Sequence, residues 1–225
     1  MKYENKNAFD YENGFYLTSD IYRLGNILSH YELYKKIVHV PGDIVECGVF
    51  KGGSLIQFAS FRELLENEKS RKIIGFDAFG SFPAPPSRED SDIKSDKDFI
   101  QGWNESFAEE FLTKEDIYDS LAHKGIGNVE LVAGDIMETV EQYVKEHPAM
   151  RISLLHIDVD VYHPAKQALD VLYPLVVRGG VVVLDDYGAV EGETIAAEEF
   201  LEIHKEYVLQ KFPFSHTKPS FFVKR

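Results

Sequence analysis

HIDVDVYHP (residues 156–164) and LDDYG (residues 184–188) each place acidic residues at the end of an apolar run. The runs are ISLL before the first stretch and VVV before the second. Such runs are typical of strands buried on both faces of a parallel sheet, and α/β sheets bind ligands at the carboxyl ends of their strands. Carboxylates gathered there cannot all stay ionised without protons or a cation. The two stretches therefore predict a divalent metal site.

Strand and helix patterns alternate along the chain. The strand patterns cover residues 43–50, 72–79, 128–135, 152–160 and 181–186, and helical patterns cover residues 20–38, 54–68, 104–122, 137–146, 164–177 and 193–207. This alternation predicts βαβ units with right-handed crossovers, and so an α/β fold with a mostly parallel central sheet and helices on both faces. Two short apolar runs on either side of residues 216–218 predict an antiparallel hairpin at the sheet edge.

Two segments interrupt the alternation. Residues 1–16 are polar and aromatic, and we expect an arm with weak local structure. Residues 80–103 are rich in proline, serine and acidic side chains, and we expect a lid over the site, because loops of this length are uncommon and often functional. The alternative is a disordered surface insertion. The whole chain, 1–225, is expected to form a single domain, with an N-terminal arm and helix in 1–40 and a lid-like insertion in 80–122.

The composition limits the classes of function. A net charge of −14 disfavours nucleic acid and anionic membranes as partners, since both require basic patches. The single cysteine, Cys47, excludes an internal disulfide and a cysteine-based zinc cluster. The N-terminus lacks the apolar segment of a signal peptide, and no apolar run approaches membrane-spanning length. We therefore expect a soluble protein in the cytoplasm.

A glycine-rich turn follows the first strand pattern, in VECGVFKGGS (residues 45–54). Glycines allow a ligand to approach the backbone closely, and the helix behind the turn presents free N–H groups. The spacing does not match G-x-G-x-x-G or a phosphate-binding loop, and a tight turn without a ligand explains the glycines equally well. Asp77 and Asp135 end the next two strand patterns, and Asp77 is placed to bind the ribose hydroxyls of a nucleoside lying across the sheet edge.

The acidic residues of the two opening stretches offer only oxygen ligands: Asp158, Asp160, Asp185 and Asp186. Such ligands favour magnesium or calcium over zinc. Without a metal, the DD pair would be a solvated turn or a helix cap. Two histidines, His156 and His163, flank the acidic residues, although a lone histidine is more often structural than a ligand.

Several motifs together resemble the macrocin O-methyltransferase (TylF) family. They are PGDIVECGVFKGGS, FDAFGSFP, LVAGDIMETV and LLHIDVDVYHPAKQALDVLYPLVVRGGVVVLDDYG, and the resemblance extends over residues 17–207. It implies a Rossmann-like, class I methyltransferase fold with an antiparallel C-terminal strand. It also implies an enzyme that uses S-adenosylmethionine and Mg²⁺ to methylate a sugar hydroxyl of a natural product, acting on a sugar-containing small molecule as a self-associating protein.

The resemblance also implies roles for individual residues. The metal would be held by Asp158, Asp185 and Asp186, and Asp160 would be the general base, with His163 as its competitor. The residues that would bind S-adenosylmethionine are Glu46, Cys47, Gly48, Ser54, Asp77, Ala78, Phe79, Gly134, Asp135, Ile136 and Asp158. Within this set, the residues of the glycine turn would line the methionine end, Asp77 would hold the ribose, and Asp135 and Ile136 would face the adenine.

Three other functions are alternatives to sugar O-methylation. A catechol-type, metal-dependent O-methyltransferase acting on a phenol would need the same acidic site. A nicotinamide-dependent oxidoreductase would use the same sheet order, but the missing G-x-G-x-x-G motif disfavours it. A binding or scaffold protein on a degenerate methyltransferase fold would not need four carboxylates on one edge of the sheet.

Overall fold

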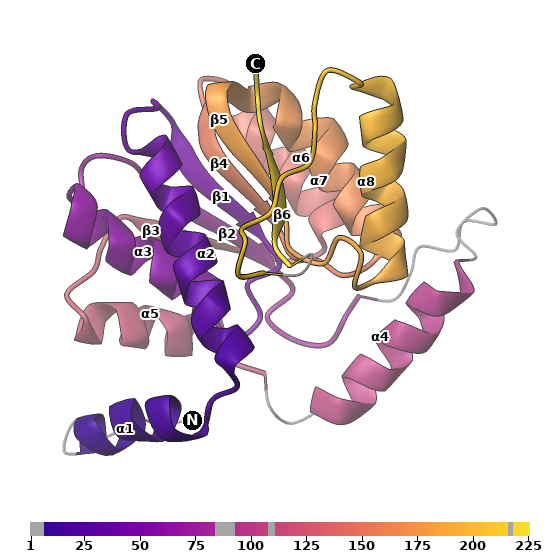
Figure 1. The fold of residues 1–225 in the computed structure, drawn as a ribbon. Helices are drawn as coiled ribbons and strands as arrows, with labels where there is room; N and C mark the ends of the chain where they lie inside the picture. The colour runs from indigo at the N-terminus through magenta and orange to yellow at the C-terminus, as the bar shows by residue number, and fades with distance from the viewer. Residues whose placement is uncertain (1–6, 84–92, 108–110, 216–217) are drawn as a thin grey trace.

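The computed structural model describes residues 7–83, 93–107, 111–215 and 218–225. Its centre is a six-stranded sheet in the order β3-β2-β1-β4-β5-β6, in which the first five strands are parallel and β6 is antiparallel to β5 (Figure 1). The strands are β1 (Asp43–Cys47), β2 (Ile73–Asp77), β3 (Val129–Ala133), β4 (Ile152–Ile157), β5 (Val176–Leu184) and β6 (Ser220–Val223). The predicted α/β fold with a mostly parallel sheet is confirmed.

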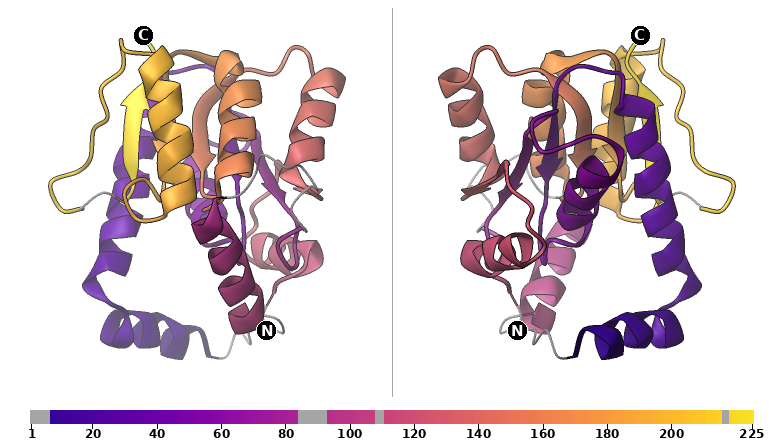
Figure 2. Two further views of the ribbon diagram at one scale, coloured as in Figure 1. Left: turned by 90° about the vertical axis from the view of Figure 1, so that its right-hand side faces the viewer. Right: turned by 90° about the vertical axis from the view of Figure 1, so that its left-hand side faces the viewer.

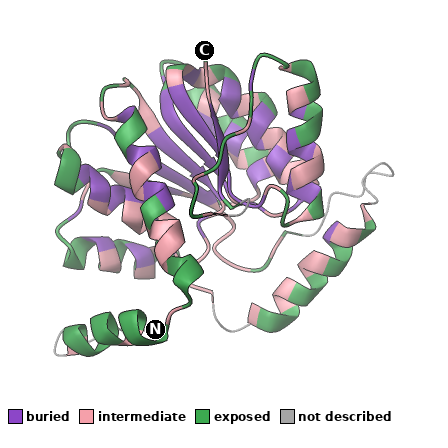
Figure 3. Cartoon of the chain, in the orientation of Figure 1, coloured by how far each residue is buried: buried purple, intermediate pink, exposed green. Residues whose placement is uncertain are grey.

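Helices cover both faces of the sheet (Figures 1 and 2). One face carries α2 (Ile21–Ile37), α3 (Gly53–Leu65) and α5 (Lys114–His123), and the other carries α6 (Ile136–Glu146), α7 (Tyr162–Leu172) and α8 (Glu191–Ile203). A short 3-10 helix, η2 (Tyr173–Leu175), follows α7. Every residue of β4 is buried, and Figure 3 shows the sheet as the buried centre of the molecule. Continuous apolar strands are what a sheet covered on both faces requires.

Successive strands are added on one side of β1 as far as β3, and on its other side from β4 onward. The carboxyl ends of β1 and β4 therefore lie at a topological switch point, where α/β proteins bind ligands. The two strand ends approach each other closely at Gly48. Its φ is +91°, and a Cβ atom there would lie 1.7 Å from the carbonyl oxygen of Asp158. Only glycine fits this position, so the glycine turn serves the packing of β1 against the acidic stretch.

The N-terminal arm and the 80–122 segment contain more helix than predicted. Residues 8–18 form α1 (Ala8–Thr18), where we expected weak local structure, and the predicted 80–103 loop contains the start of α4 (Lys94–Phe107). The single helix predicted over residues 104–122 was wrong, because Thr113 caps a new helix, α5, through a capping box with Asp116. The predicted lid also includes residues 84–92 and 108–110, which lie outside the described residues.

The C-terminal part differs in two places. The helix predicted over residues 164–177 ends at Leu172, and β5 begins at Val176, because Val176 already pairs with Ile152 of β4. The predicted hairpin is reduced to one antiparallel bridge between Gln210 and Phe221, while β6 pairs with β5. Within the described residues, no helix is both long and apolar enough to cross a membrane.

Candidate active site

Three aspartates meet beside the carboxyl ends of β4 and β5. Asp158 follows β4, and its N–H donates to Cys47 of β1 at 2.9 Å; Asp185 follows β5, and its N–H donates to Ile157 at 2.9 Å. These bonds extend the sheet and bring the side chains of Asp158, Asp185 and Asp186 together, with one oxygen of each lying within 4.8 Å of the others. The convergence predicted from the two acidic stretches is therefore present.

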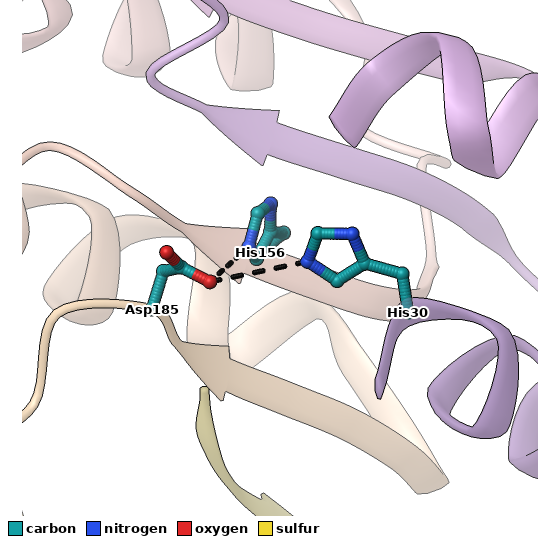
Figure 4. Close-up of side chains that lie close together, drawn as sticks. All are labelled: His30, His156 and Asp185. Carbon is teal, nitrogen blue, oxygen red and sulfur yellow. Dashed lines mark hydrogen bonds and ion pairs between the residues drawn. The ribbon is translucent and has the colours of Figure 1, made fainter. Parts of the chain in front are cut away.

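Asp185 is contacted by two buried histidines, His156 and His30 (Figure 4), which begin a row of polar side chains. His156 of β4 places Nε2 3.5 Å from Asp185 Oδ1, and His30 of α2 places Nε2 3.9 Å from the same oxygen. On its other side, His156 Nδ1 lies 3.5 Å from Glu46 Oε1, and Ser54 donates a hydrogen bond to Glu46. This row fixes the position of one carboxylate of the cluster.

The pKa values of the acidic residues are shifted in opposite directions, upward by burial and like charge and downward by neighbouring histidines. Burial and the charge of Asp185 raise the pKa of Asp158, and burial and the charge of Asp186 raise the pKa of Asp160 to about 8. Burial alone would also raise the pKa of Asp185, but hydrogen bonds from His156 and His30 hold it well below its usual range. The cluster therefore resists full ionisation, as crowded carboxylates do in the absence of a cation.

Two further charged groups complete the cluster. Glu193 of α8 is fully buried and accepts a hydrogen bond from the backbone N–H of Asp186 at 2.9 Å. Lys218, which precedes β6, makes an ion pair with Asp186 Oδ1 and lies 3.9 Å from Asp185 Oδ2. One cation thus already faces the aspartates.

A cleft with about 670 Å³ of empty space opens beside the aspartates. Eight of the residues predicted to bind the cofactor line it: Gly48, Asp77, Ala78, Phe79, Gly134, Asp135, Ile136 and Asp158. Asp160, the predicted base, lines it too. Asp158 belongs both to the cleft and to the acidic cluster, so the two form one continuous site.

Asp77 orders the glycine turn at one end of this cleft. Its Oδ2 accepts the N–H groups of Val49 and Phe50 at 2.8 and 2.9 Å, and its Oδ1 accepts the N–H of Phe79 at 2.5 Å. A carboxylate has about four lone-pair sites, so roughly one remains for a ligand. Asp135 caps α6 through the N–H of Met137 at 2.9 Å and lines the cleft at the same time.

Among the residues predicted to bind the cofactor or to act in catalysis, four lie outside the lining of the cleft, as far as the described residues define it: Glu46, Cys47, Ser54 and His163. Glu46 and Ser54 face the buried row behind Asp185. Cys47 lies in the hydrophobic core, where burial raises the pKa of its thiol. Asp160 lines the cleft, whereas His163 is absent from the lining that the described residues form.

Aromatic side chains form the outer wall of the cleft. Trp103 of α4 stacks on Phe99 with ring centroids 5.7 Å apart and meets Phe50 of the glycine turn at 5.0 Å. Phe82 also lies against Trp103, at 6.2 Å, and both side chains line the cleft. The 80–122 segment therefore contributes directly to the site.

Four residues at the site were not predicted from the sequence: His30, Glu193, Lys218 and Trp103. His30 lies on the buried face of α2 beside Leu33 and Ile37, and a polar residue on that apolar stripe was the one available signal. Glu193 and Lys218 gave no comparable signal, because they reach the aspartates only through the packing of α8 and the return of β6 along β5.

Comparisons with known proteins agree with this geometry. The model of the Macrocin-O-methyltransferase (TylF) family matches residues 23–208. One curated relative is 8-demethyl-8-(2,3-dimethoxy-alpha-L-rhamnosyl)-tetracenomycin-C 4'-O-methyltransferase of Streptomyces olivaceus, which is 27% identical over 150 residues, or 66% of this chain and 54% of that protein. The chain therefore spans about half the length of this relative.

Solved structures of two methyltransferases have similar folds. CalS11, a calicheamicin methyltransferase, is 26% identical with a TM-score of 0.68, and the match covers 94% of this chain and 83% of that one. The O-methyltransferase NovP is 20% identical with a TM-score of 0.73, and the match covers 88% of this chain and 78% of that one. The fold is thus the Rossmann-like fold of class I methyltransferases, and the chain belongs to the macrocin O-methyltransferase (TylF) family.

Proposed function

We propose that this chain is an S-adenosylmethionine-dependent O-methyltransferase that methylates a sugar hydroxyl with the help of Mg²⁺. The observation that carries the proposal is that Asp158 both lines the cleft and belongs to the acidic cluster. A cofactor in the cleft and a cation on the aspartates would therefore be neighbours. Membership of the TylF family supports this assignment.

The cofactor's place follows from the cleft lining. Gly48 allows close approach to the backbone, the remaining lone-pair site of Asp77 is available to a ribose hydroxyl, and Asp135 and Ile136 also line the cleft. These positions agree with a nucleoside lying across the carboxyl ends of the strands. The sulfonium group would then lie toward Asp158.

The acidic cluster suits a hard divalent cation. Asp158, Asp185 and Asp186 offer oxygen ligands within 4.8 Å of one another, which fits Mg²⁺ better than zinc. When bound, the cation would lower the pKa of an acceptor hydroxyl and orient adjacent hydroxyls. His156 and His30 would keep the Asp185 carboxylate ionised and oriented for this purpose.

Asp160 would accept the hydroxyl proton. In methyl transfer, a bond forms between the hydroxyl oxygen and the methyl carbon, the carbon–sulfur bond breaks, and the proton must leave the oxygen. Asp160 lines the cleft with a pKa raised to about 8, which makes it a stronger base than an ordinary carboxylate. Its φ of +63° is uncommon for a residue other than glycine, and such backbone positions cluster at functional sites.

The relatives and the aromatic wall support a sugar as the acceptor. CalS11, 26% identical, is described as a TDP-rhamnose 3'-O-methyltransferase, and the relative from Streptomyces olivaceus acts on a rhamnosyl compound by its name. Trp103 and Phe82 offer aromatic faces that can bury the apolar side of a sugar ring. A phenolic acceptor is the second candidate, because the same aromatic wall would also accommodate it.

The acceptor class is tested by incubating the protein with S-adenosylmethionine, Mg²⁺ and either a TDP-deoxysugar or a catechol. Methylation of the sugar, detected by mass spectrometry, is expected; methylation of the catechol alone would contradict the sugar assignment. Thermal-shift measurements should show stabilisation by S-adenosylhomocysteine and none by NAD, because ligands stabilise the state that binds them. The reverse result would support an oxidoreductase.

Asp160→Asn tests the base. We expect turnover to fall by about 10²-fold or more, while S-adenosylhomocysteine affinity, measured by calorimetry, stays near that of the wild type. His163→Gln is the companion variant, and Glu202→Gln, on the exposed side of α8, is the control. A normal rate in Asp160→Asn together with a strongly reduced rate in His163→Gln would transfer the role to His163.

A further inference from the structure

Lys218 faces the position that a metal would occupy. Its ammonium pairs with Asp186 Oδ1 and lies 3.9 Å from Asp185 Oδ2, so it contacts two of the three proposed metal ligands. Both aspartates are buried, whereas the lysine side chain is 44% exposed. The lysine therefore reaches into the acidic cluster from the protein surface.

The charges of this cluster explain why an ammonium group lies there. Like carboxylates at short range require a compensating positive charge, and Lys218 supplies one. A lysine side chain is protonated at neutral pH in water, and the two neighbouring carboxylates favour its charged form. The ammonium thus remains charged at neutral pH.

A magnesium ion held by Asp185 and Asp186 would lie close to the Lys218 ammonium, and the two positive charges would repel each other. Mg²⁺ binds oxygen at about 2.0–2.1 Å in a near-octahedral shell, so it would displace the lysine nitrogen by charge repulsion. Resting on the metal role proposed above, we propose that Lys218 is an internal counter-ion of the aspartate cluster, which competes with the metal and leaves the site when the metal binds.

Lys218 has room to move outward. It also lines a second hollow, together with Tyr22, Arg23 and Asn26 of α2 and Phe214 of the C-terminal segment. A flexible four-carbon side chain can turn from the aspartates toward this hollow without a change in the sheet. Lys218 also lies beyond residue 208, the last residue that the family model matches, so the proposal concerns a residue outside the matched region.

Calorimetric titration with MgCl₂ tests the competition, in the absence of cofactor and acceptor. Lys218→Met should bind Mg²⁺ at least about tenfold more tightly than the wild type, because a unit positive charge about 4 Å from the site is removed. Lys218→Arg keeps the charge and should remain weak. Lys205→Met, beyond the end of α8, removes an equal charge at a distance and should leave the affinity unchanged.

Thermal unfolding gives an independent readout. In chelator, Lys218→Met should melt below the wild type, because the carboxylates lose their counter-ion, and saturating Mg²⁺ should raise its melting temperature more than that of the wild type. Lys218→Gln gives the same comparison if the methionine variant does not fold. Equal or weaker Mg²⁺ binding in Lys218→Met and Lys218→Gln than in the wild type, or no Mg²⁺ binding in any variant, would overturn the proposal. Because no methyl transfer is measured, the result is separate from the test of the proposed activity.

Discussion

His156 is a fully buried titratable group between two carboxylates. Burial disfavours its charged form, but hydrogen bonds and charges from Asp185 and Glu46 raise its pKa well above the usual value. A histidine whose pKa is higher in the folded state stabilises the protein while it is protonated. This contribution is complete below the unfolded pKa of about 6.5 and is lost as pH rises through the folded value.

His156→Gln should therefore remove a pH-dependent part of the stability. In chelator, we expect the free energy of unfolding of the wild type to exceed that of the variant most below about pH 6.5, with the difference narrowing at higher pH. Each unit of pKa shift corresponds to about 1.4 kcal/mol. Denaturant unfolding at a series of pH values measures the difference in free energy of unfolding between wild type and variant. His123→Gln, at an exposed residue at the end of α5, is the control. Parallel curves for wild type and variant would contradict the expected charge.

The predictable site residues are those that follow an apolar run. Asp158, Asp185 and Asp186 could be predicted because the ends of buried parallel strands meet at one edge of a sheet. His30 and Lys218 could not, since their contacts join segments far apart in the chain. The same limit applies to the cofactor residues: Cys47 ends β1 and lies in the core, whereas Gly48, just past the strand, lines the cleft.

At the scale of elements, α4 holds the aromatic wall in place through one buried carboxylate. Asp96, in the first turn of α4, accepts the N–H of Tyr162 at the start of α7 at 2.8 Å. Gly192 of α8 leaves room for this carboxylate, since a Cβ there would lie 2.2 Å from Asp96 Oδ1. The position of Trp103, two turns along α4, therefore depends on Asp96.

Asp96→Ala should loosen α4 from the body of the molecule. It leaves the N–H of Tyr162 without its partner, which costs about 1–3 kcal/mol. Trp103 is the only tryptophan, so its emission reports on this helix: we expect a red shift and greater quenching by acrylamide. Asp98→Ala, on the exposed side of α4, is the matched control. An unchanged spectrum in Asp96→Ala would show that other contacts suffice to hold α4.

The strand and helix order was predictable, but several boundaries were not. Alternating apolar runs and glycine turns specify the five parallel strands, because each run must be buried on both faces. β5 starts early because Val176 pairs with Ile152 of β4. β6 forms because the C-terminal segment pairs with the outer edge of β5. Such pairings are set by tertiary structure, which no local pattern contains.

At the scale of the whole molecule, α1 is a helix without a buried face. All eleven residues of this helix are described, and none of them is buried. Phe9 and Leu17 are 78% and 84% exposed, and Figure 1 shows α1 standing away from the sheet. An isolated helix this short is marginal in water, so α1 needs a surface to pack against. We propose that a second copy of this chain provides it, in agreement with the self-association that the family resemblance implies.

A double substitution, Phe9→Glu and Leu17→Glu, should therefore separate the copies. We expect light scattering coupled to size-exclusion chromatography to show an oligomer for the wild type and a monomer for the variant, because two charges on the apolar surface cannot be buried at the contact. Leu64→Glu, on α3 at a residue that is 76% exposed, is the matched control and should remain oligomeric. A wild type that is monomeric at micromolar concentrations would refute the packing of α1 on a second copy. Since Asp158, Asp185 and Asp186 all belong to one chain, the monomeric variant should still bind Mg²⁺ with the affinity of the wild type.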